Sequence, residues 1–516
     1  MRKTKIVCTI GPASDNEEIL KKLMLAGMNA ARINFSHGSF KEQEEKIKKI
    51  KKVSKELGLN IPLILDTKGP EVRIGKFEDG EIFLKPGDTF SLVPDEIMGT
   101  QYEFSVSYKD LYKELKHGDK LLIDDGLIEV EVITIKDKKI YCKVISGGKL
   151  SNRKSINIPG KRLNLPSLTE KDRDDILNGI KADFDFIAAS FIRSAKDVME
   201  IRKLLNDNGG ENIKIISKIE NQEGVDNFDE ILDVSDGIMV ARGDLSVEIP
   251  MAKVPMIQKE FIKKTYLNGK IVITATQMLE SMINNPRPTR AEVSDISNAI
   301  YDATSAIMLS GETATGKYPV DCVEMMSNIS EETENAIHYW KRYLGRNYDL
   351  ENKGYRFSLY NGIAAGAMNL KAKAILAYTL SGDTPGILSA FCPTCPIYAI
   401  TGSPTVARQM NLCWNVFPIL VKNQKNVDKM LETAIDELRL KGEINKGDIL
   451  LIAGGAEILP DVEDAELNKV IGGIIKVWIV AGTGNFGNIL PKFPVPMTPI
   501  RRSFNLIYNC IVMLSK

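Results

Sequence analysis

A repeated alternation of strand and helix patterns constrains the fold of this chain most strongly. Short apolar runs rich in β-branched residues end in polar residues, and almost every one is followed by a stretch with helical apolar spacing. Eight such runs occur, at residues 5–10, 30–36, 63–66, 184–191, 213–220, 237–244, 270–276 and 306–312. Because continuous apolar strands that alternate with helices form a covered parallel sheet, eight of them predict a closed (β/α)8 TIM barrel.

One interval between these runs is too long for a single helix and its loops. About 117 residues separate the third run from the fourth. This interval contains short alternating runs punctuated by turn signals, at residues 72–77, 82–84, 89–92, 120–123, 127–135 and 140–145. We therefore predict that residues 1–69 and 161–340 form the barrel, and that residues 70–160 form a small antiparallel β domain inserted in it.

A second α/β region follows the barrel. Residues 341–355 are polar and predict a linker, and helix and strand patterns then alternate from residue 359 to residue 453. This alternation predicts an open α/β domain over residues 341–480, with a last strand near residues 470–480. The tail at residues 481–516 has no pattern that assigns a structure.

Charge and hydropathy exclude several classes of function. The 68 basic and 68 acidic side chains cancel to a formal net charge of zero, which leaves no overall field to hold nucleic acid or an anionic membrane surface. No apolar run reaches about 18 residues, and the first residues lack a signal-peptide pattern. The seven cysteines are too scattered for a disulfide framework. We expect a cytoplasmic globular protein without a nucleic-acid or membrane partner.

The ends of the predicted barrel strands are unusually polar. Functional residues of such barrels lie at the carboxyl ends of the strands. These ends carry Arg32, Asn34, Ser36, His37, Asp66, Thr67, Lys68, Lys218, Glu220, Arg242, Asp244, Thr274, Thr276, Ser310 and Glu312, with Arg73 just beyond the third strand. A structural ion pair would explain one charged end, but it explains five neighbouring ends poorly. We therefore predict a functional site at this barrel mouth.

The charged residues at this mouth suit phosphoryl transfer. Glu220 and Asp244 end adjacent strands, and two carboxylates leave open positions on Mg²⁺ for a substrate phosphate. Lys218 precedes Glu220 by two residues, so both side chains point to one face; a simple salt bridge between them is the alternative. A lysine beside a metal ligand stabilises charge on a transferring phosphoryl group. Arg32 and Arg73 add planar donors for phosphate.

A second cluster consists mainly of neutral oxygens. Asn34, Ser36, Asp66 and Thr67 offer one carboxylate and several neutral ligands, which favours a monovalent cation. The turn at residues 242–244 offers backbone N–H groups to an anion such as a carboxylate. Of three histidines only His37 ends a strand, so a histidine-based triad is not expected.

Several segments resemble the pyruvate kinase family. They are KIVCTIGPAS (5–14), RINFSHG (32–38), DTKGPEVR (66–73), DDG (124–126), ISKIEN (216–221), MVARGD (239–244), ATQMLESM (275–282) and MLSGETA (308–314). The resemblance covers residues 1–340 with every motif in order, and it continues more loosely to about residue 453.

This resemblance implies transfer of the phosphoryl group of phosphoenolpyruvate to ADP, giving pyruvate and ATP, with Mg²⁺ or Mn²⁺ and K⁺. For the ions, it implies that the divalent cation is bound by Glu220 and Asp244, and that K⁺ is bound by Asn34, Ser36, Asp66 and Thr67. For the substrate, it implies that Lys218 stabilises the phosphoryl group, that phosphate is contacted by Arg32 and Arg73, that the carboxylate is positioned by Gly243, Asp244 and Thr276, and that a proton is delivered by Thr276 and Ser310. For the nucleotide, it implies contacts from Asn34, His37, Arg73 and Lys154. Because Lys154 belongs to the inserted domain, the resemblance also implies that this domain is a small β-barrel that closes over the nucleotide as a lid. The resemblance also implies a homotetramer.

Two further expectations come from the resemblance. Glu71 stands where a lysine makes other members independent of K⁺, so we predict K⁺ dependence. Thr379, Ser381, Gly382 and Thr384 lie in a segment that resembles the family's effector loop, which implies a phosphorylated allosteric activator. That loop contains no Lys or Arg, and a plain strand-to-helix turn is the alternative reading.

The sequence also departs from the family pattern. Ser246 replaces the usual glycine, and an insertion at residues 456–473 and the tail at 481–516 replace the usual ending. Two other functions stay open at this point. A metal-dependent carbon–carbon lyase of the pyruvate or oxaloacetate class also presents two carboxylates to Mg²⁺, but it needs neither Lys218 nor a lid. A catalytically idle effector-binding homologue would not need the intact set of strand-end residues.

Overall fold

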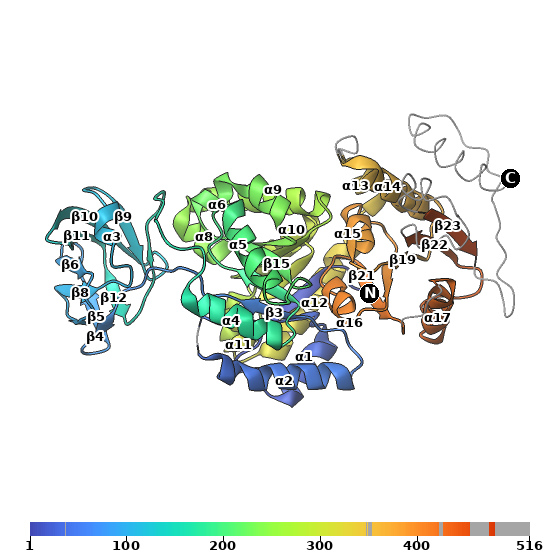
Figure 1. Cartoon of the computed structure of the whole chain (residues 1–516), viewed down its shortest axis with the longest axis horizontal. Coiled ribbons are helices and arrows are strands. Elements are labelled where there is room, and N and C mark those ends of the chain that lie inside the picture. The colour runs from blue at the N-terminus through green and yellow to red at the C-terminus, as the bar shows by residue number, and fades with distance from the viewer. Residues whose placement is uncertain (37, 347, 349–352, 423–426, 455–473, 480–516) are drawn as a thin grey trace.

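Three structural regions follow one another along the long axis of the molecule (Figure 1). The computed structural model describes residues 1–36, 38–346, 348, 353–422, 427–454 and 474–479. A small β domain lies at one end, a closed barrel lies in the middle, and an α/β domain lies at the other end. None of the helices described is both long enough and apolar enough to cross a membrane.

The central region is the predicted (β/α)8 barrel. Its strands are β1 (Lys5–Thr9), β2 (Ala30–Asn34), β3 (Leu63–Asp66), β14 (Phe186–Ala189), β15 (Lys214–Ile219), β16 (Gly237–Ala241), β17 (Ile271–Ala275) and β18 (Ala306–Leu309). They close in the order β1-β18-β17-β16-β15-β14-β3-β2, and each neighbouring pair is parallel. All eight predicted runs are barrel strands, so the prediction is confirmed.

Helices surround this barrel and explain why its strands are apolar on both faces. The helices are α1 (Glu17–Ala26), α2 (Phe40–Glu56), α4 (Glu170–Lys181), α5 (Ala195–Asn206), α6 (Gln222–Asp226), α7 (Phe228–Val234), α8 (Arg242–Glu248), α9 (Val254–Leu267), α10 (Arg290–Tyr301), α11 (Gly311–Ala314) and α12 (Pro319–Ala336), with short 3₁₀ turns η1 (Met251–Lys253) and η2 (Glu280–Ile283). Successive residues of one strand belong to two different apolar clusters: Ile215 packs outward against the helices, and Ile216 packs inside the barrel.

The inserted domain has its own hydrophobic core but not one continuous sheet. Its elements are β4 (Lys76–Phe77), β5 (Glu81–Leu84), β6 (Thr89–Val93), β7 (Met98–Gly99), β8 (Glu103–Ser105), α3 (Leu111–Glu114), β9 (Lys120–Ile123), β10 (Ile128–Lys136), β11 (Lys139–Ser146), β12 (Gly148–Ser151) and β13 (Ile156–Asn157). Six strands pair in the order β13-β9-β10-β11-β6-β8, and β12–β5 and β4–β7 form separate pairs.

This arrangement corrects two details of the expected β-barrel. The strands divide into three sheets around a shared core instead of closing into a single sheet, and β6–β8 and β4–β7 are parallel. The predicted strand at residues 72–77 shortens to β4, because Arg73 and Ile74 bridge to two different partners, Ser155 and Val106. The chain therefore changes its pairing partner from one residue to the next where the barrel passes into the inserted domain.

The C-terminal domain is the predicted open sheet. Its elements are α13 (Tyr339–Leu344), α14 (Gly354–Asn369), β19 (Ala374–Tyr378), α15 (Asp383–Ala390), β20 (Ile397–Thr401), α16 (Pro404–Met410), β21 (Val416–Leu420), α17 (Val427–Leu440), β22 (Ile449–Gly454) and β23 (Ile474–Ile479). The strand order is β21-β20-β19-β22-β23, and β23 is antiparallel to β22. The expected linker at 341–355 is partly helical, since α13 and α14 extend into it. Residues 456–473 and 481–516 lie outside the described residues.

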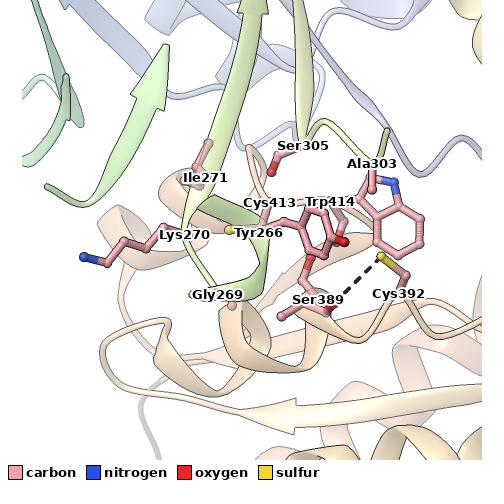
Figure 2. A pocket seen from close by; sticks show the side chains of 12 residues that line it. Tyr266, Gly269, Lys270, Ile271, Ala303, Ser305, Ser389, Cys392, Cys413 and Trp414 are labelled. Atoms are coloured by element: carbon pink, nitrogen blue, oxygen red, sulfur yellow. Dashed lines mark hydrogen bonds between the residues drawn. The ribbon is translucent and has the colours of Figure 1, made fainter. Parts of the chain in front are cut away.

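The C-terminal domain packs against the amino-terminal end of the barrel. Figure 2 shows Tyr266 and Ile271 of the barrel opposite Ser389, Cys392 and Trp414 of the C-terminal domain, around a cavity of only about 10 Å³. A space of this size holds about one water molecule. The two domains are therefore closely packed at this point, and the cavity is too small for a ligand.

A buried carboxylate joins the same two domains. Asp185 precedes β14 and is 0 % exposed; its Oδ2 accepts from the backbone N of Leu63 at 2.9 Å, and its Oδ1 accepts from Nε of Arg408 at 2.8 Å. Burial raises the pKa of Asp185 to about 6, although Arg408 opposes this shift. Ionisation of Asp185 therefore costs stability as the pH rises from its ordinary pKa of 3.8 through about 6, and Arg408 offsets this cost.

We predict that Arg408→Met lowers the thermal midpoint more at pH 8 than at pH 5. Loss of the cation leaves a buried carboxylate unpaired at pH 8, which costs about 3 kcal/mol, whereas at pH 5 the carboxyl is largely protonated. Differential scanning fluorimetry of the variant and wild type at both pH values measures the difference. Asp183→Asn is the control, because it removes the exposed pairs of Asp183 with Arg408 and Lys51 and leaves the buried pair of Arg408 with Asp185. Equal destabilisation at the two pH values would contradict this account.

Candidate active site

Lys218 lies at the centre of the barrel mouth. It is 8 % exposed, and its Nζ donates to Oδ1 of Asp66 at 3.1 Å, to Oγ of Ser190 at 2.8 Å and to Oε1 of Glu220 at 2.9 Å. Burial lowers the pKa of a lysine, but the charges of Asp66 and Glu220 more than offset it and raise the pKa of Lys218. Lys218 is therefore a cation fixed by three oxygens from three different strand ends.

Arg32 supplies the second buried cation. Its Nε donates to Oδ2 of Asp66 at 2.7 Å, and its Nη1 donates to Oγ1 of Thr9 at 2.8 Å. Asp66 is 1 % exposed, and burial alone would disfavour its ionised form. Arg32 and Lys218 nevertheless hold the pKa of Asp66 below its usual value. Arg32, Asp66 and Lys218 thus form a continuous chain of ion pairs across the mouth.

Glu220 and Asp244 are brought together at the ends of the neighbouring strands β15 and β16. Oε2 of Glu220 accepts from the backbone N of Phe191 at 2.6 Å. Burial and the Asp244 carboxylate raise the pKa of Glu220, against the opposing effect of Lys218. Within the described residues, the Asp244 carboxylate makes no hydrogen bond or ion pair, so its oxygens remain available as ligands. The pair suits a hard divalent cation that keeps open positions.

The oxygen-rich cluster also lies together. Asn34 and Asp66 are paired residues of β2 and β3, and Oδ1 of Asn34 accepts from the backbone N of Ser36 at 2.9 Å. The carbonyl of Thr67 accepts from Oγ of Ser190 at 2.7 Å. Because the Asp66 carboxylate is already paired with Arg32 and Lys218, this cluster has little negative charge left for a cation. Its neutral oxygens therefore fit a monovalent ion better than a divalent one.

The inserted domain contributes two cations to the same cavity, which has a volume of about 270 Å³. Arg73 pairs with Glu71 at 2.7 Å, and its Nη1 donates to the carbonyl of Arg153 at 2.7 Å. Lys154 pairs with Asp124 at 2.8 Å. Both cations face the barrel mouth while they are held by carboxylates of the chain segment that carries them.

Three of the predicted residues form the neighbouring part of the mouth. The backbone N of Gly243 donates to Oγ1 of Thr276 at 2.8 Å, and that hydroxyl donates to the carbonyl of Ala275 at 2.6 Å. Thr276 has a φ of 69°, which a β-branched residue rarely adopts. Ser310 follows the adjacent strand β18, and its backbone N donates to Glu312 at 2.7 Å. Thr276, Gly243 and Ser310 do not line the cavity around Lys218.

The remaining predicted residues either lie in the C-terminal domain, away from the barrel mouth, or are not among the described residues. His37 lies outside the described residues. The effector-loop residues lie in the C-terminal domain: Oγ1 of Thr379 accepts from the backbone N of Gly382 at 2.8 Å, Oγ of Ser381 accepts from the backbone N of Asp383 at 3.4 Å, and the hydroxyl of Thr384 contacts that of Tyr360 at 3.0 Å. Gly382 has a φ of 93°, which a glycine adopts without strain.

Sequence reasoning missed one residue at the centre of the site. Ser190 directly follows β14, is 4 % exposed, and contacts both Lys218 and Thr67. Its position at a strand end was the available signal, since the same rule identified the residues after the other strands. The backbone N of Phe191, which donates to Glu220, left no such signal because a backbone N–H is the same for almost every residue type.

Two family models match most of the chain. One, described as the barrel domain of pyruvate kinase, matches residues 1–323, and the other, its alpha/beta domain, matches residues 359–466. The chain belongs to the pyruvate kinase family. It is therefore an enzyme, and the functional alternatives of a lyase and an idle homologue are not favoured by these matches.

Curated relatives agree with the family models. A protein named pyruvate kinase from Clostridium acetobutylicum is 48% identical over 456 residues, which are 88% of this chain and 96% of that protein. Proteins of the same name from Sporosarcina psychrophila and Staphylococcus haemolyticus are each 49% identical over 461 residues, which cover 89% and 88% of this chain and 78% of each relative. The similarity thus spans both the barrel and the C-terminal domain.

Proposed function

We propose that this enzyme transfers the phosphoryl group of phosphoenolpyruvate to ADP and then protonates the resulting enolate, giving ATP and pyruvate. The observation that carries the proposal is the buried ammonium of Lys218 beside two carboxylates at one barrel mouth. Negative charge spreads over the equatorial phosphoryl oxygens during transfer, and a fixed cation at this position stabilises it.

The proposed steps use residues that line this cavity and residues of the neighbouring part of the barrel mouth. Arg32 and Lys218 bind the phosphoryl group of phosphoenolpyruvate, and Arg73 and Lys154 approach the nucleotide phosphates from the inserted domain, together with Asn34 and His37. The backbone near Gly243 and Asp244 and the hydroxyl of Thr276 orient the substrate carboxylate. Thr276 and Ser310 belong to the network that delivers a proton to the enolate carbon.

The ions have separate places in this proposal. Glu220 and Asp244 would hold Mg²⁺ or Mn²⁺, which neutralises phosphate charge when bound. Asn34, Ser36, Asp66 and the carbonyl of Thr67 would hold K⁺. ATP formation from phosphoenolpyruvate and ADP, measured with Mg²⁺ and K⁺, tests the whole assignment, and decarboxylation of oxaloacetate tests the lyase alternative. We further propose a cytoplasmic homotetramer, which sedimentation analysis tests.

We predict that Lys218→Met lowers kcat for ATP formation by about 10³-fold. The fixed positive charge that stabilises the transferring group is lost, while the side chain keeps a similar length. Isothermal titration with Mn²⁺ is the control: Glu220 and Asp244 remain, so the ion still binds. If the variant keeps most of the turnover of wild type, Lys218 has only a structural role.

We predict that activity depends on K⁺ because residue 71 is a glutamate, paired with Arg73, where a lysine would add a fixed positive charge. Replacing K⁺ by tetramethylammonium at constant ionic strength should lower kcat by about tenfold or more, since this ion is too large for the cluster. Glu71→Lys should retain activity without K⁺ because its ammonium supplies the charge. Equal turnover of wild type in both salts rules out a K⁺ site.

We also propose that the loop at residues 379–384 binds a phosphorylated effector. The loop contains no Lys or Arg, but it borders a cavity of about 910 Å³ between the two domains, to which the barrel contributes Lys214 and Lys270. Sugar phosphates and nucleotides at 100 times their Kd should raise the stability by about 2.7 kcal/mol.

A thermal-shift screen measures this stabilisation, and Ser381→Asp should abolish it because a carboxylate repels the phosphate. If no phosphorylated compound raises the midpoint of wild type, the loop is a plain strand-to-helix turn.

A further inference from the structure

A direct hydrogen bond connects the inserted domain with the helix that carries Asp244. Helix α8 (Arg242–Glu248) begins immediately after β16 and lies on the side of the barrel nearest the inserted domain (Figure 1). Asp244 lies in its first turn, and Glu248 is its last residue. Nδ2 of Asn157, in β13 of the inserted domain, donates to Oε1 of Glu248 at 2.8 Å.

Helix α8 is held firmly by the barrel. The guanidinium of Arg242 donates to the carbonyl of Ala275 at 3.2 Å and to Asp295 at 2.5 Å, and Leu245 is 0 % exposed. Asp244 and Glu248 are four residues apart, so they share one face of the helix. A domain that binds Glu248 is therefore placed on the same face as the Asp244 carboxylate.

A second contact lies beside the first. The turn at residues 124–126 contains Asp124, which pairs with Lys154. A β-carbon at Gly126 would lie 3.8 Å from Cγ1 of Val247, so this turn runs alongside α8. The inserted domain therefore rests on α8 at both Val247 and Glu248, and of these two contacts only that of Glu248 is a directional polar bond.

The distance from this contact to the cavity is short. Asn157 follows Lys154 by three residues, which span at most about 10 Å of extended chain. A displacement of Asn157 therefore also displaces Lys154. Glu248 is also a charged acceptor, and hydrogen bonds to charged groups are stronger than neutral ones.

We propose that Asn157 and Glu248 are positioning residues that latch the inserted domain onto α8 and so place Lys154 over the metal-binding carboxylate Asp244. The inference rests on the proposed function, because it assigns Lys154 to the nucleotide and Asp244 to the divalent ion. It predicts that the latch serves the nucleotide step, whereas phosphoenolpyruvate is bound by residues of the barrel.

The test is a steady-state comparison of Asn157→Ala and Glu248→Ala with wild type, using phosphoenolpyruvate, ADP, Mg²⁺ and K⁺. Each variant should lower kcat/KM for ADP by about tenfold, the loss expected for one hydrogen bond to a charged group. The KM for phosphoenolpyruvate should stay within about twofold of wild type. Because both variants break the same bond, the double variant should be no worse than either single variant.

Two further variants separate positioning from general destabilisation. Glu248→Gln keeps an acceptor oxygen for Asn157 and should restore most of kcat/KM for ADP. Arg162→Met removes a different contact, just after the inserted domain returns to the barrel: the pair between Arg162 and Glu223 at 3.0 Å, which does not involve α8. This control should match wild type in kcat/KM for ADP.

The outcomes distinguish the inference from the proposed function. If wild type forms no ATP, the proposed function fails. If wild type is active and Asn157→Ala matches it, or if Arg162→Met loses as much as Asn157→Ala, the latch is wrong while the function stands. Equal losses in kcat/KM for ADP and for phosphoenolpyruvate would also overturn the latch, because they indicate damage to the barrel mouth.

Discussion

The buried ion pairs around Lys218 are the interaction on which the barrel mouth depends. Lys218 and Arg32 balance Asp66 and Glu220 inside the barrel, where none of the four exceeds 9 % exposure. An unpaired charge at such a depth costs several kcal/mol, so each residue requires the others. Asp244 adds a further negative charge without a partner among the described residues. The zero net charge of the chain therefore conceals a local excess of negative charge, which favours a divalent cation and, with it, a phosphate.

The sequence was sufficient to predict the barrel and the general position of the site. Eight apolar runs identify eight parallel strands because each strand is covered on both faces, as the two neighbouring isoleucines Ile215 and Ile216 illustrate. Strand ends such as Lys218 and Asp66 then converge because a closed barrel brings every carboxyl end to one mouth. The three small sheets of the inserted domain were not predicted, because local alternation indicates strands but does not specify which strands pair. Helix α13 was missed because the polar residues that follow it make the stretch from residue 341 resemble a linker, whereas stacking of Trp340 on Tyr343 stabilises the helix.

The chemistry of the site could be predicted only by residue type. Spacing along a strand indicated the pair Lys218–Glu220, but the pairs Arg73–Glu71 and Lys154–Asp124 were not predicted and are found only in the folded chain. Strained backbone is equally hidden. Phe191 and Thr276 have positive φ values, and both take part in hydrogen bonds of the barrel mouth: the N–H of Phe191 donates to Glu220, and the hydroxyl of Thr276 accepts from the N–H of Gly243. Such strain persists because the surrounding contacts fix it, and it is concentrated at functional sites.

The paired cations of the inserted domain explain how the proposed nucleotide step can be selective. Arg73 and Lys154 are each neutralised by a nearby carboxylate, so they exert little long-range attraction on anions in general. A ligand replaces Glu71 and Asp124 only if it binds Arg73 and Lys154 more strongly than these carboxylates do. A polyphosphate can bind more strongly because it presents several charged oxygens to both cations at once, whereas each carboxylate presents only two oxygens to one cation. Exchange of partners, rather than attraction to an open positive patch, would then favour a nucleotide over smaller anions at the mouth of the barrel.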